Sequence, residues 1–174
     1  MLKLSDNELH WYVANTCRQE KKIKQRLDSM GIENFIPFQQ IARKIHGVDK
    51  LIEVPVIPNL VFIHTTFKSC MSLIQEYAFD MRYLRDRETG NFLIVPDKQM
   101  NDFMFLLDFS DSTVEVINEE LKRGDRVRVI KGPLIGLEGE LLRIKGHKRV
   151  IVRLEGVVSV ATSYIPGSFL EKIK

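Results

Sequence analysis

Apolar residues near the start of the chain change from a strand-like to a helix-like spacing. The run His10–Val13 is aromatic and β-branched, which predicts a strand. Apolar residues then recur at i, i+4 and i+7, which predicts an amphipathic helix ending at Gly31. These helical positions are Ile23, Leu27 and Met30. Because Gln19 follows Thr16 by three residues, we expect a capping box at the start of this helix.

The next segment is predicted to be extended. Two runs, Phe35–Arg43 and Lys50–Val56, flank Gly47 and predict a long β-hairpin. The run Leu60–Ile63 is continuously apolar, which is typical of a strand buried on both faces.

Two more helical patterns follow, separated by a short hairpin. The first consists of Cys70, Leu73, Ile74 and Tyr77, and the second of Met100, Phe103, Met104 and Leu107. Between them, Met81–Leu84 and Phe92–Val95 flank a turn at residues 89–91. Strands that interleave with helices in this way predict an α+β fold, a ferredoxin-like sandwich with helices over an antiparallel sheet.

The last third of the chain shows short strands only. Seven of its residues are glycine, out of ten in the whole chain. The glycines separate the strand-sized runs Arg126–Ile130, Glu140–Ile144, Val150–Leu154 and Val157–Thr162. We therefore expect a first domain at 1–109, an acidic linker at 110–120, and a small SH3-like β-barrel at 121–174. The glycines and two prolines disfavour a helical form of this tail.

The charge of the chain is unevenly distributed, although its net value is only +3. Residues 1–109 are balanced, residues 110–120 carry four acidic and no basic residues, and residues 121–174 carry 12 basic against five acidic residues. Such asymmetry favours a nucleic-acid or ribonucleoprotein partner. The composition, 44% hydrophobic and 28% charged, is that of a packed globular protein.

Several classes of protein are disfavoured. The longest apolar stretch is broken by two prolines, and the N-terminus lacks the layout of a signal peptide, so we expect no membrane contact and a cytoplasmic location. The four histidines lie 18 or more residues apart, which predicts no metal site. The glycine-rich run Gly132–Gly139 lacks the Lys-Ser/Thr of a phosphate-binding loop. We therefore expect no cofactor and no catalytic residues.

Two groups of basic residues are candidates for nucleic-acid binding. The predicted first helix carries Arg18, Lys21, Lys22, Lys24 and Arg26, mostly in its first two turns, where the helix dipole favours anions instead. A phosphate contact is one interpretation and a solvated helix face is the other. Arg43 and Lys44, near the predicted hairpin tip, form the second group.

The run Val54–Phe62 contains two prolines, which place it at a sheet edge or a bend. Its apolar residues Ile57, Leu60 and Phe62 could form ordinary core or an exposed patch for a protein partner. The residues alone leave both interpretations open.

Motifs along nearly the whole chain resemble those of NusG-type transcription elongation factors. These motifs are Trp11-Tyr12-Val13, Glu20-Lys21-Lys22, the run Pro55–Phe62, and Gly124–Val129 followed by Gly132-Pro133, Gly136 and Gly139-Glu140. The first part resembles the NusG N-terminal domain and the second a KOW domain, whose motif runs from about Val127 to Leu154. Their order along one chain is more specific than either motif alone.

The resemblance implies a non-enzymatic, monomeric factor that docks on the clamp helices of RNA polymerase and suppresses pausing or termination. The implied polymerase contacts are Trp11, Tyr12, Ile57, Pro58, Asn59, Leu60 and Phe62. Asn59 stands where housekeeping members have glycine, which is similar to the RfaH- and UpxY-type members that act on polysaccharide operons.

Such specialised members also touch non-template DNA, which would involve Arg18, Lys21 and Lys22. The KOW domain would meet the ribosome, a termination factor or RNA. The alternative hypothesis is a KOW-type protein that binds RNA or the ribosome without any polymerase contact.

Overall fold

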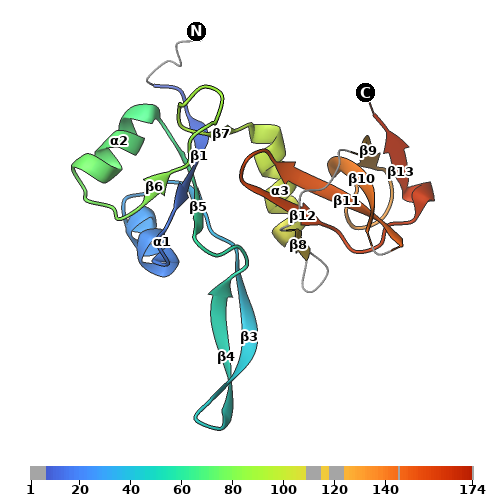
Figure 1. Cartoon of the computed structure of the whole chain (residues 1–174), viewed down its shortest axis with the longest axis horizontal. Coiled ribbons are helices and arrows are strands. Elements are labelled where there is room, and N and C mark those ends of the chain that lie inside the picture. Colours follow the sequence, from blue (N-terminus) through green and yellow to red (C-terminus); the bar gives the residue numbers. More distant parts are fainter. Residues whose placement is uncertain (1–6, 109–114, 118–123, 145, 174) are drawn as a thin grey trace. The chain divides into compact units, whose positions relative to one another are not determined.

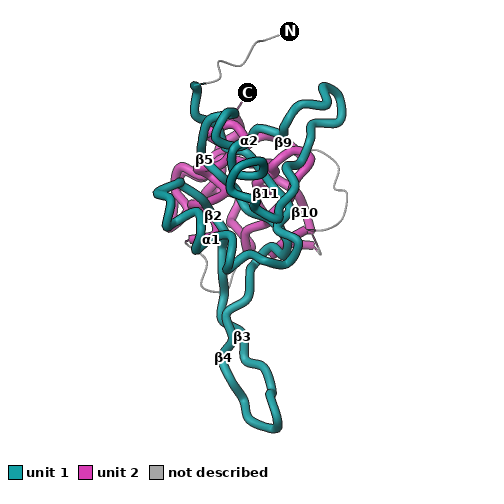
Figure 2. The backbone as a smooth tube through the Cα atoms, turned by 90° about the vertical axis from the view of Figure 1, so that its left-hand side faces the viewer, with its two compact units in different colours: residues 1–94 teal, residues 95–174 magenta. Residues whose placement is uncertain are grey.

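The computed structural model describes residues 7–108, 115–117, 124–144 and 146–173. The chain forms two compact units, residues 1–94 and 95–174 (Figure 2). Each unit has its own sheet.

The first unit is built on an antiparallel sheet with the order β2-β5-β1-β6, and β7 also pairs with β1 (Figure 1). The strands are β1 (His10–Asn15), β2 (Asn34–Phe35), β5 (Leu60–Thr65), β6 (Arg82–Tyr83) and β7 (Ile94–Val95). The central pair, β1 and β5, runs in register from His10 opposite Thr65 to Asn15 opposite Leu60. The strands predicted at 10–13 and 60–63 are therefore confirmed.

Two helices, α1 (Glu20–Ser29) and α2 (Phe67–Gln75), pack against the same face of this sheet. Alternate residues of the strands meet the apolar stripes of both helices in one cluster. Its central members are Tyr12, Ala14, Ile23, Leu27, Val61, Ile63, Cys70 and Leu73. The mixed α+β architecture predicted from the spacing of apolar residues is confirmed.

The start of α1 differs from the prediction. The N-cap residue is Gln19, and its side chain makes no capping bond. The hydroxyl of Thr16 is buried and has no hydrogen-bond partner among the described residues. The predicted capping box is wrong, because the Gln19 side chain bonds instead to the carboxylate of Asp80, at 2.6 Å.

A two-stranded hairpin extends away from the rest of the first unit (Figures 1 and 2). It consists of β3 (Phe38–Ile45) and β4 (Val48–Pro55), which pair only with each other. The turn residues His46 and Gly47 both have positive φ, 51° and 80°, which is typical of a two-residue hairpin turn. The long hairpin predicted around Gly47 is confirmed.

The second unit contains α3 (Asp97–Asp108) and a six-stranded antiparallel sheet with the order β13-β9-β10-β11-β12-β8. The strands are β8 (Glu115–Ile117), β9 (Asp125–Val129), β10 (Glu138–Ile144), β11 (His147–Leu154), β12 (Val158–Ala161) and β13 (Leu170–Lys172), with a short 3-10 helix at Gly167–Phe169. Inward residues such as Val127, Val150 and Leu154 are almost completely buried. The tail is thus a β structure, as its glycine content predicts.

The boundary between the two compact units, after residue 94, does not coincide with the end of the first domain predicted from the sequence, at residue 109. The helix α3, which we expected in the first domain, falls within the second compact unit. Part of the predicted acidic linker, Glu115–Ile117, is strand β8, with Val116 opposite Val160 of β12. A three-residue strand is too short to produce a recognisable period, so the pattern could not reveal it.

None of the helices in the described ranges has the length and apolar character needed to cross a bilayer.

Candidate functional site

The bend between β4 and β5 is fixed by hydrogen bonds to the β1–α1 connection. The backbone N–H of Asn59 donates to a carboxylate oxygen of Glu20 at 2.7 Å. The carbonyl of Asn59 accepts from the backbone N–H of Thr16 at 3.0 Å. Asn59 has a φ of 65°, a left-handed conformation that only glycine and asparagine adopt readily. We call Pro58, Asn59 and Leu60 the docking corner.

The docking corner is accessible, whereas the other predicted polymerase contacts are not. Pro58 is exposed, and Asn59 and Leu60 are partly exposed. Four other predicted contact residues are buried: Trp11 is 4% exposed, Tyr12 1%, Ile57 5% and Phe62 0%. The exposed apolar patch expected at Ile57, Leu60 and Phe62 is therefore reduced to Leu60, because the flanking residues face inward.

The buried aromatic residues make defined contacts within the first unit. The Trp11 ring stacks on His64, with centroids 4.8 Å apart and planes inclined by 16°. Nδ1 of His64 lies 2.6 Å from a carboxylate oxygen of Glu33. Tyr12 belongs to the core between sheet and helices, and burial raises the pKa of its phenol to about 12. These rings support the strands that carry the docking corner.

Two of the basic residues at the first helix make contacts within the first unit, and the other three are exposed. The Arg26 guanidinium donates to the carbonyl of Tyr77 and lies 3.9 Å from the ring centroid of Phe79. Lys24 forms an ion pair with Asp28 at 3.2 Å. These two side chains therefore contribute to structure, and the phosphate-contact interpretation is confined to the remaining three.

The remaining three, Arg18, Lys21 and Lys22, are exposed. Lys21 pairs with Glu53 of β4 at 3.1 Å, and Lys22 donates to the side chain of Gln19. Arg18 has no ionic partner in the described part of the chain. It also has a φ of 65°, next to Cys17 with 51°, so the β1–α1 connection contains two successive left-handed residues. No sequence pattern revealed this backbone strain, since neither residue is glycine or asparagine.

The two hairpin residues predicted to bind nucleic acid lie on opposite faces. Successive strand residues alternate in direction, so Arg43 and Lys44 cannot contact one surface together. Arg43 is directly opposite Lys50, and Lys44 is opposite Asp49. The face with Arg43 and Lys50 therefore carries two adjacent cations, and it is the better candidate for an anionic partner.

Comparison with known proteins assigns the chain to a family. A family model described as "Transcription termination factor nusG" matches residues 9–104, and the KOW motif matches residues 123–153. The chain belongs to the NusG family. Its two family domains identify it as a transcription elongation factor, as the resemblance of its motifs implies. The NusG match ends inside α3, past the division between the compact units.

Two solved structures are similar to nearly the whole of this NusG-family chain. One, described as "Domain interaction in Thermotoga maritima NusG", is 18% identical, with 96% of this chain and 98% of that chain covered at a TM-score of 0.47. The other, a chain of the MjSpt4:Spt5 complex, is 15% identical, with 94% and 97% covered at a TM-score of 0.27. No curated protein matches the chain.

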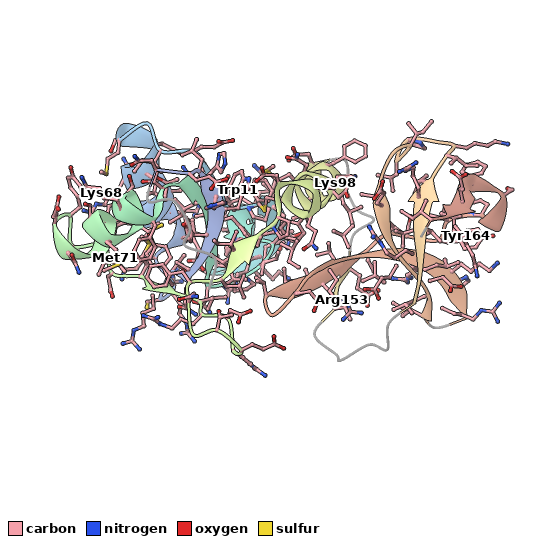
Figure 3. All side chains as sticks on the ribbon, turned by 90° about the horizontal axis from the view of Figure 1, so that it is seen from above. Trp11, Lys68, Met71, Lys98, Arg153 and Tyr164 are labelled. Carbon is pink, nitrogen blue, oxygen red and sulfur yellow. The ribbon has the colours of Figure 1, made fainter. Side chains whose placement is uncertain are left out.

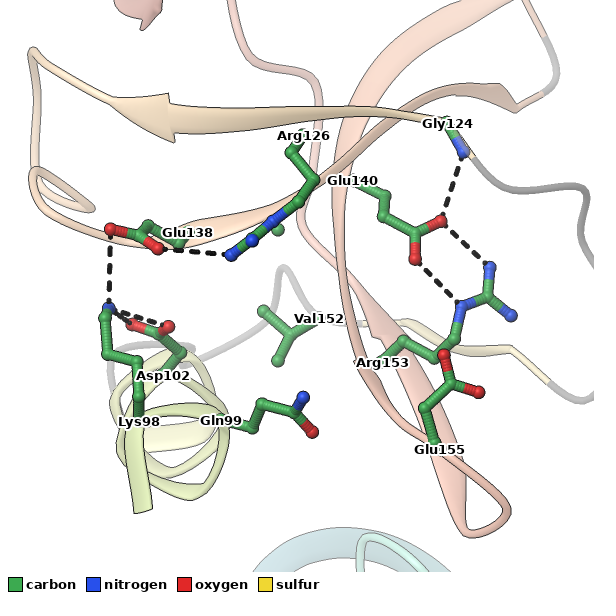
Figure 4. A pocket seen from close by; sticks show the side chains of 11 residues that line it. Lys98, Gln99, Asp102, Gly124, Arg126, Glu138, Glu140, Val152, Arg153 and Glu155 are labelled. Atoms are coloured by element: carbon green, nitrogen blue, oxygen red, sulfur yellow. Dashed lines mark hydrogen bonds and ion pairs between the residues drawn. The ribbon is translucent and has the colours of Figure 1, made fainter. Parts of the chain in front are cut away.

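The second unit of this NusG-family chain has a pocket of about 430 Å³ between α3 and the barrel strands (Figure 4). Six of its charged side chains are paired with each other. Lys98 lies 2.8 Å from Asp102, and Glu138 lies 3.5 Å from Arg126. Glu140 accepts from Arg153 at 3.2 Å and from the backbone N–H of Gly124 at 3.1 Å. Since these charges already satisfy one another, the pocket is a poor candidate for an ionic ligand.

Two carboxylates of this pocket, Asp102 and Glu138, have pKa values shifted in opposite directions. Burial raises the pKa of Asp102, although two hydrogen bonds from Lys98 act against this. The hydrogen bond from Arg128 lowers the pKa of Glu138. In the described residues, no group of three or more His, Cys, Asp or Glu side chains is placed to hold a metal ion.

Proposed function

We propose that this NusG-family elongation factor binds the clamp helices of RNA polymerase through its docking corner and suppresses pausing or termination. The observation that carries the proposal is the fixed, accessible bend at Pro58, Asn59 and Leu60. Family membership supports an association with transcription, and the bend supplies a surface for it.

The docking corner suits recognition because its backbone is already ordered before any partner arrives. Bonds to Glu20 and Thr16 hold Asn59 from both sides, so binding would cost little loop entropy. Leu60 would be the apolar anchor, since its side chain is only partly covered. In this proposal the buried residues Ile57 and Phe62 position the corner rather than touch the polymerase.

A contact of this kind can act on elongation without catalysis. If the factor binds more tightly to the closed clamp than to the open clamp, its binding shifts the population toward the closed state. The closed state holds nucleic acid more firmly, which is consistent with suppression of pausing. The factor itself then needs neither a cofactor nor a reaction.

We extend the proposal to non-template DNA, with Arg18, Lys21 and Lys22 as contacts. Arg18 is exposed on a fixed connection and lacks an ionic partner among the described residues, so it is the strongest of the three. On the hairpin, Arg43 with Lys50 would bind phosphates on one face. Lys44, on the other face, would contribute less.

We also propose that the factor acts on selected operons, such as those for polysaccharide synthesis. The φ of 65° at position 59 suits asparagine and glycine alike, so the presence of asparagine has a purely conformational explanation. The support for specialised action is therefore the resemblance to specialised family members alone. Mapping the tagged factor along the genome tests this part. Occupancy of a few long operons supports it, and uniform occupancy of all transcribed genes refutes it.

The polymerase proposal is tested by equilibrium binding of the full chain to core RNA polymerase. Leu60→Glu places a charge in the apolar contact and is expected to weaken binding by about 10-fold or more. Leu9→Glu is the matched control, because Leu9 is 55% exposed and lies outside the docking corner. Equal affinities of both variants and the parent would exclude the docking corner as the contact. The alternative of a KOW protein without polymerase contact predicts no binding by any of the three.

A further inference from the structure

Three residues form a row across the sheet of the first unit, and this row begins at the docking corner. Asn15 of β1 is directly opposite Leu60 of β5 on one side and directly opposite Arg82 of β6 on the other. Residues that are directly opposite each other in antiparallel strands lie on the same face of the sheet. We call Leu60, Asn15 and Arg82 the cross-strand row.

The cross-strand row lies on the face of the sheet that is turned away from α1 and α2. The adjacent residue of each strand belongs to the core beneath these helices, namely Ala14, Val61 and Tyr83. Since successive strand residues alternate in direction, the row itself points to the other face. Arg82 is exposed and the other two members are partly exposed, so a partner can reach the whole row.

The charge of Arg82 is not compensated within the ranges that the structure describes. The two acidic residues that flank it along the chain are engaged elsewhere. Asp80 accepts a hydrogen bond from the side chain of Gln19 at 2.6 Å, and Asp86 accepts from the backbone N–H of Thr89 at 2.7 Å. The guanidinium of Arg82 is therefore available to a carboxylate of another molecule.

Arg85, three residues further on, shows the contrast. Its guanidinium donates to the carbonyl of Gly90 at 2.8 Å and lies 5.1 Å from the ring centroid of Phe92. Arg85 thus stabilises its own turn, whereas Arg82 has no comparable role among the described residues.

The spacing of the cross-strand row favours a helix as the partner. Leu60 and Arg82 are two strand spacings apart, or roughly 10 Å. A helix that lies across the strands matches this distance, because its residues i and i+7 are separated by about 10.5 Å along the axis. Asn15, between the two, adds no charge, and its Oδ1 already accepts from the backbone N–H of Cys17 at 2.9 Å. A phosphate backbone could pair with Arg82 but would offer no apolar surface to Leu60.

We infer that Arg82 pairs with a carboxylate on a clamp helix of the polymerase, about two turns from the apolar residue that contacts Leu60. This inference rests on the proposed polymerase contact and adds the charge pattern that its partner carries. Arg82 then fixes the direction in which the helix crosses the strands, because only one orientation brings both contacts together.

The charge of Arg82 is tested by equilibrium binding of the full chain to core RNA polymerase without nucleic acid. Arg82→Ala is expected to weaken binding by about 2- to 5-fold, the range for an exposed ion pair. Arg82→Glu is expected to weaken it by about 10-fold or more, because it brings like charges together. Lys68→Glu is the matched control, since Lys68 is exposed and projects from α2 on the helix side of the sheet (Figure 3).

Two results of this binding experiment would overturn the inference. The first is an affinity of Arg82→Glu equal to that of Lys68→Glu. The second is a loss that appears only when the complex contains nucleic acid, because Arg82 would then contact phosphates. Far-ultraviolet circular dichroism and urea unfolding of each variant verify that the first unit remains folded.

The position of the carboxylate is tested by placing a photoreactive amino acid at position 82 of the full chain. Its crosslink to polymerase is mapped by mass spectrometry and compared with the crosslink from position 60. Both are expected on one clamp helix, about seven residues apart, with an aspartate or glutamate at the site reached from position 82. Replacement of that acidic residue by arginine is expected to recover most of the affinity that Arg82→Glu loses.

Failure of this inference and failure of the docking corner give different results. A crosslink from position 60 without one from position 82, or no recovery by the charge exchange, would overturn the role of Arg82 and leave the docking corner intact. No crosslink from either position, together with parental affinity in Leu60→Glu, would remove the proposed contact and this inference with it.

Discussion

The carboxylate of Glu20 accepts a 2.7 Å hydrogen bond from the backbone N–H of Asn59, 39 residues further along the chain. This contact ties the start of α1 to the bend that precedes β5. Glu20 is only 8% exposed, so water cannot easily replace it. The docking corner therefore depends on a residue outside it.

Glu20→Ala is expected to lower the free energy of unfolding by about 1 to 3 kcal/mol, because it leaves the N–H of Asn59 without its charged acceptor. Urea unfolding followed by circular dichroism measures this change. Glu20→Gln is the control, since its amide oxygen can still accept the bond and should lose less. An alanine variant as stable as the parent would show that the contact does not stabilise the bend.

Replacement of Asn59 tests whether its backbone conformation or its side chain determines the stability of the chain and its affinity for polymerase. Asn59→Val is expected to cost about 1 to 2 kcal/mol or more, because a β-branched residue resists a φ of 65°. Asn59→Gly should remain within about 0.5 kcal/mol of the parent. If the glycine variant also keeps its affinity for polymerase, the side chain is not a specificity determinant. Equal stability of the valine and glycine variants would contradict the conformational explanation.

The two cysteines are expected to differ in reactivity. Cys70 is completely buried, and burial raises the pKa of its thiol to about 12, so almost no thiolate forms near neutral pH. Cys17 is exposed. Iodoacetamide should therefore modify Cys17 in the native chain and spare Cys70, and denaturant should make both reactive. Mass spectrometry of the labelled peptides measures the ratio, and native labelling of Cys70 at the same rate would be inconsistent with its burial.

The pocket carboxylates predict opposite changes of stability with pH. Because burial raises the pKa of Asp102 above its ordinary value of 3.8, the folded state binds this proton more tightly than the unfolded state. Its contribution to stability therefore decreases as the pH rises from 3.8 through the folded-state pKa. Asp102→Asn should remove this decrease, which unfolding measurements across that interval can detect.

Glu138 provides the comparison of opposite sign. Arg128 holds the pKa of Glu138 below its ordinary value of 4.5, so its stabilising contribution is present above 4.5 and is lost as the pH falls through the folded-state pKa. Glu138→Gln should therefore reduce the acid sensitivity of the chain. The same pH dependence in both variants and the parent would contradict these assignments.

Much of the fold was predictable because apolar residues recur at regular spacings along its helices and strands. The helix α1 buries Ile23 and Leu27, as their spacing requires, and Gly31 ends it with a φ of 67°. The hairpin around Gly47 and the barrel strands were located in the same way. The short strand β8 was not, since its position depends on pairing with β12, which is distant in sequence.

The candidate site was less predictable, because exposure depends on tertiary packing. Ile57 and Leu60 look alike in the sequence, yet Ile57 is buried and Leu60 is partly exposed. The role of Glu20 could not be found either, since its acceptor bond joins residues 39 positions apart. The pairing of Arg43 with Lys50 depends on the register of the hairpin, which the sequence fixes only through the turn.

The central claim, that the docking corner touches RNA polymerase, is tested most directly by placing a photoreactive amino acid at position 60. The variant is assembled with an elongating polymerase complex and irradiated, and position 9 serves as the exposed control in the same unit. We predict a crosslink from position 60 to the clamp helices and none from position 9. Crosslinks of equal yield from both positions, or none from position 60 in a complex that contains the factor, would contradict the claim.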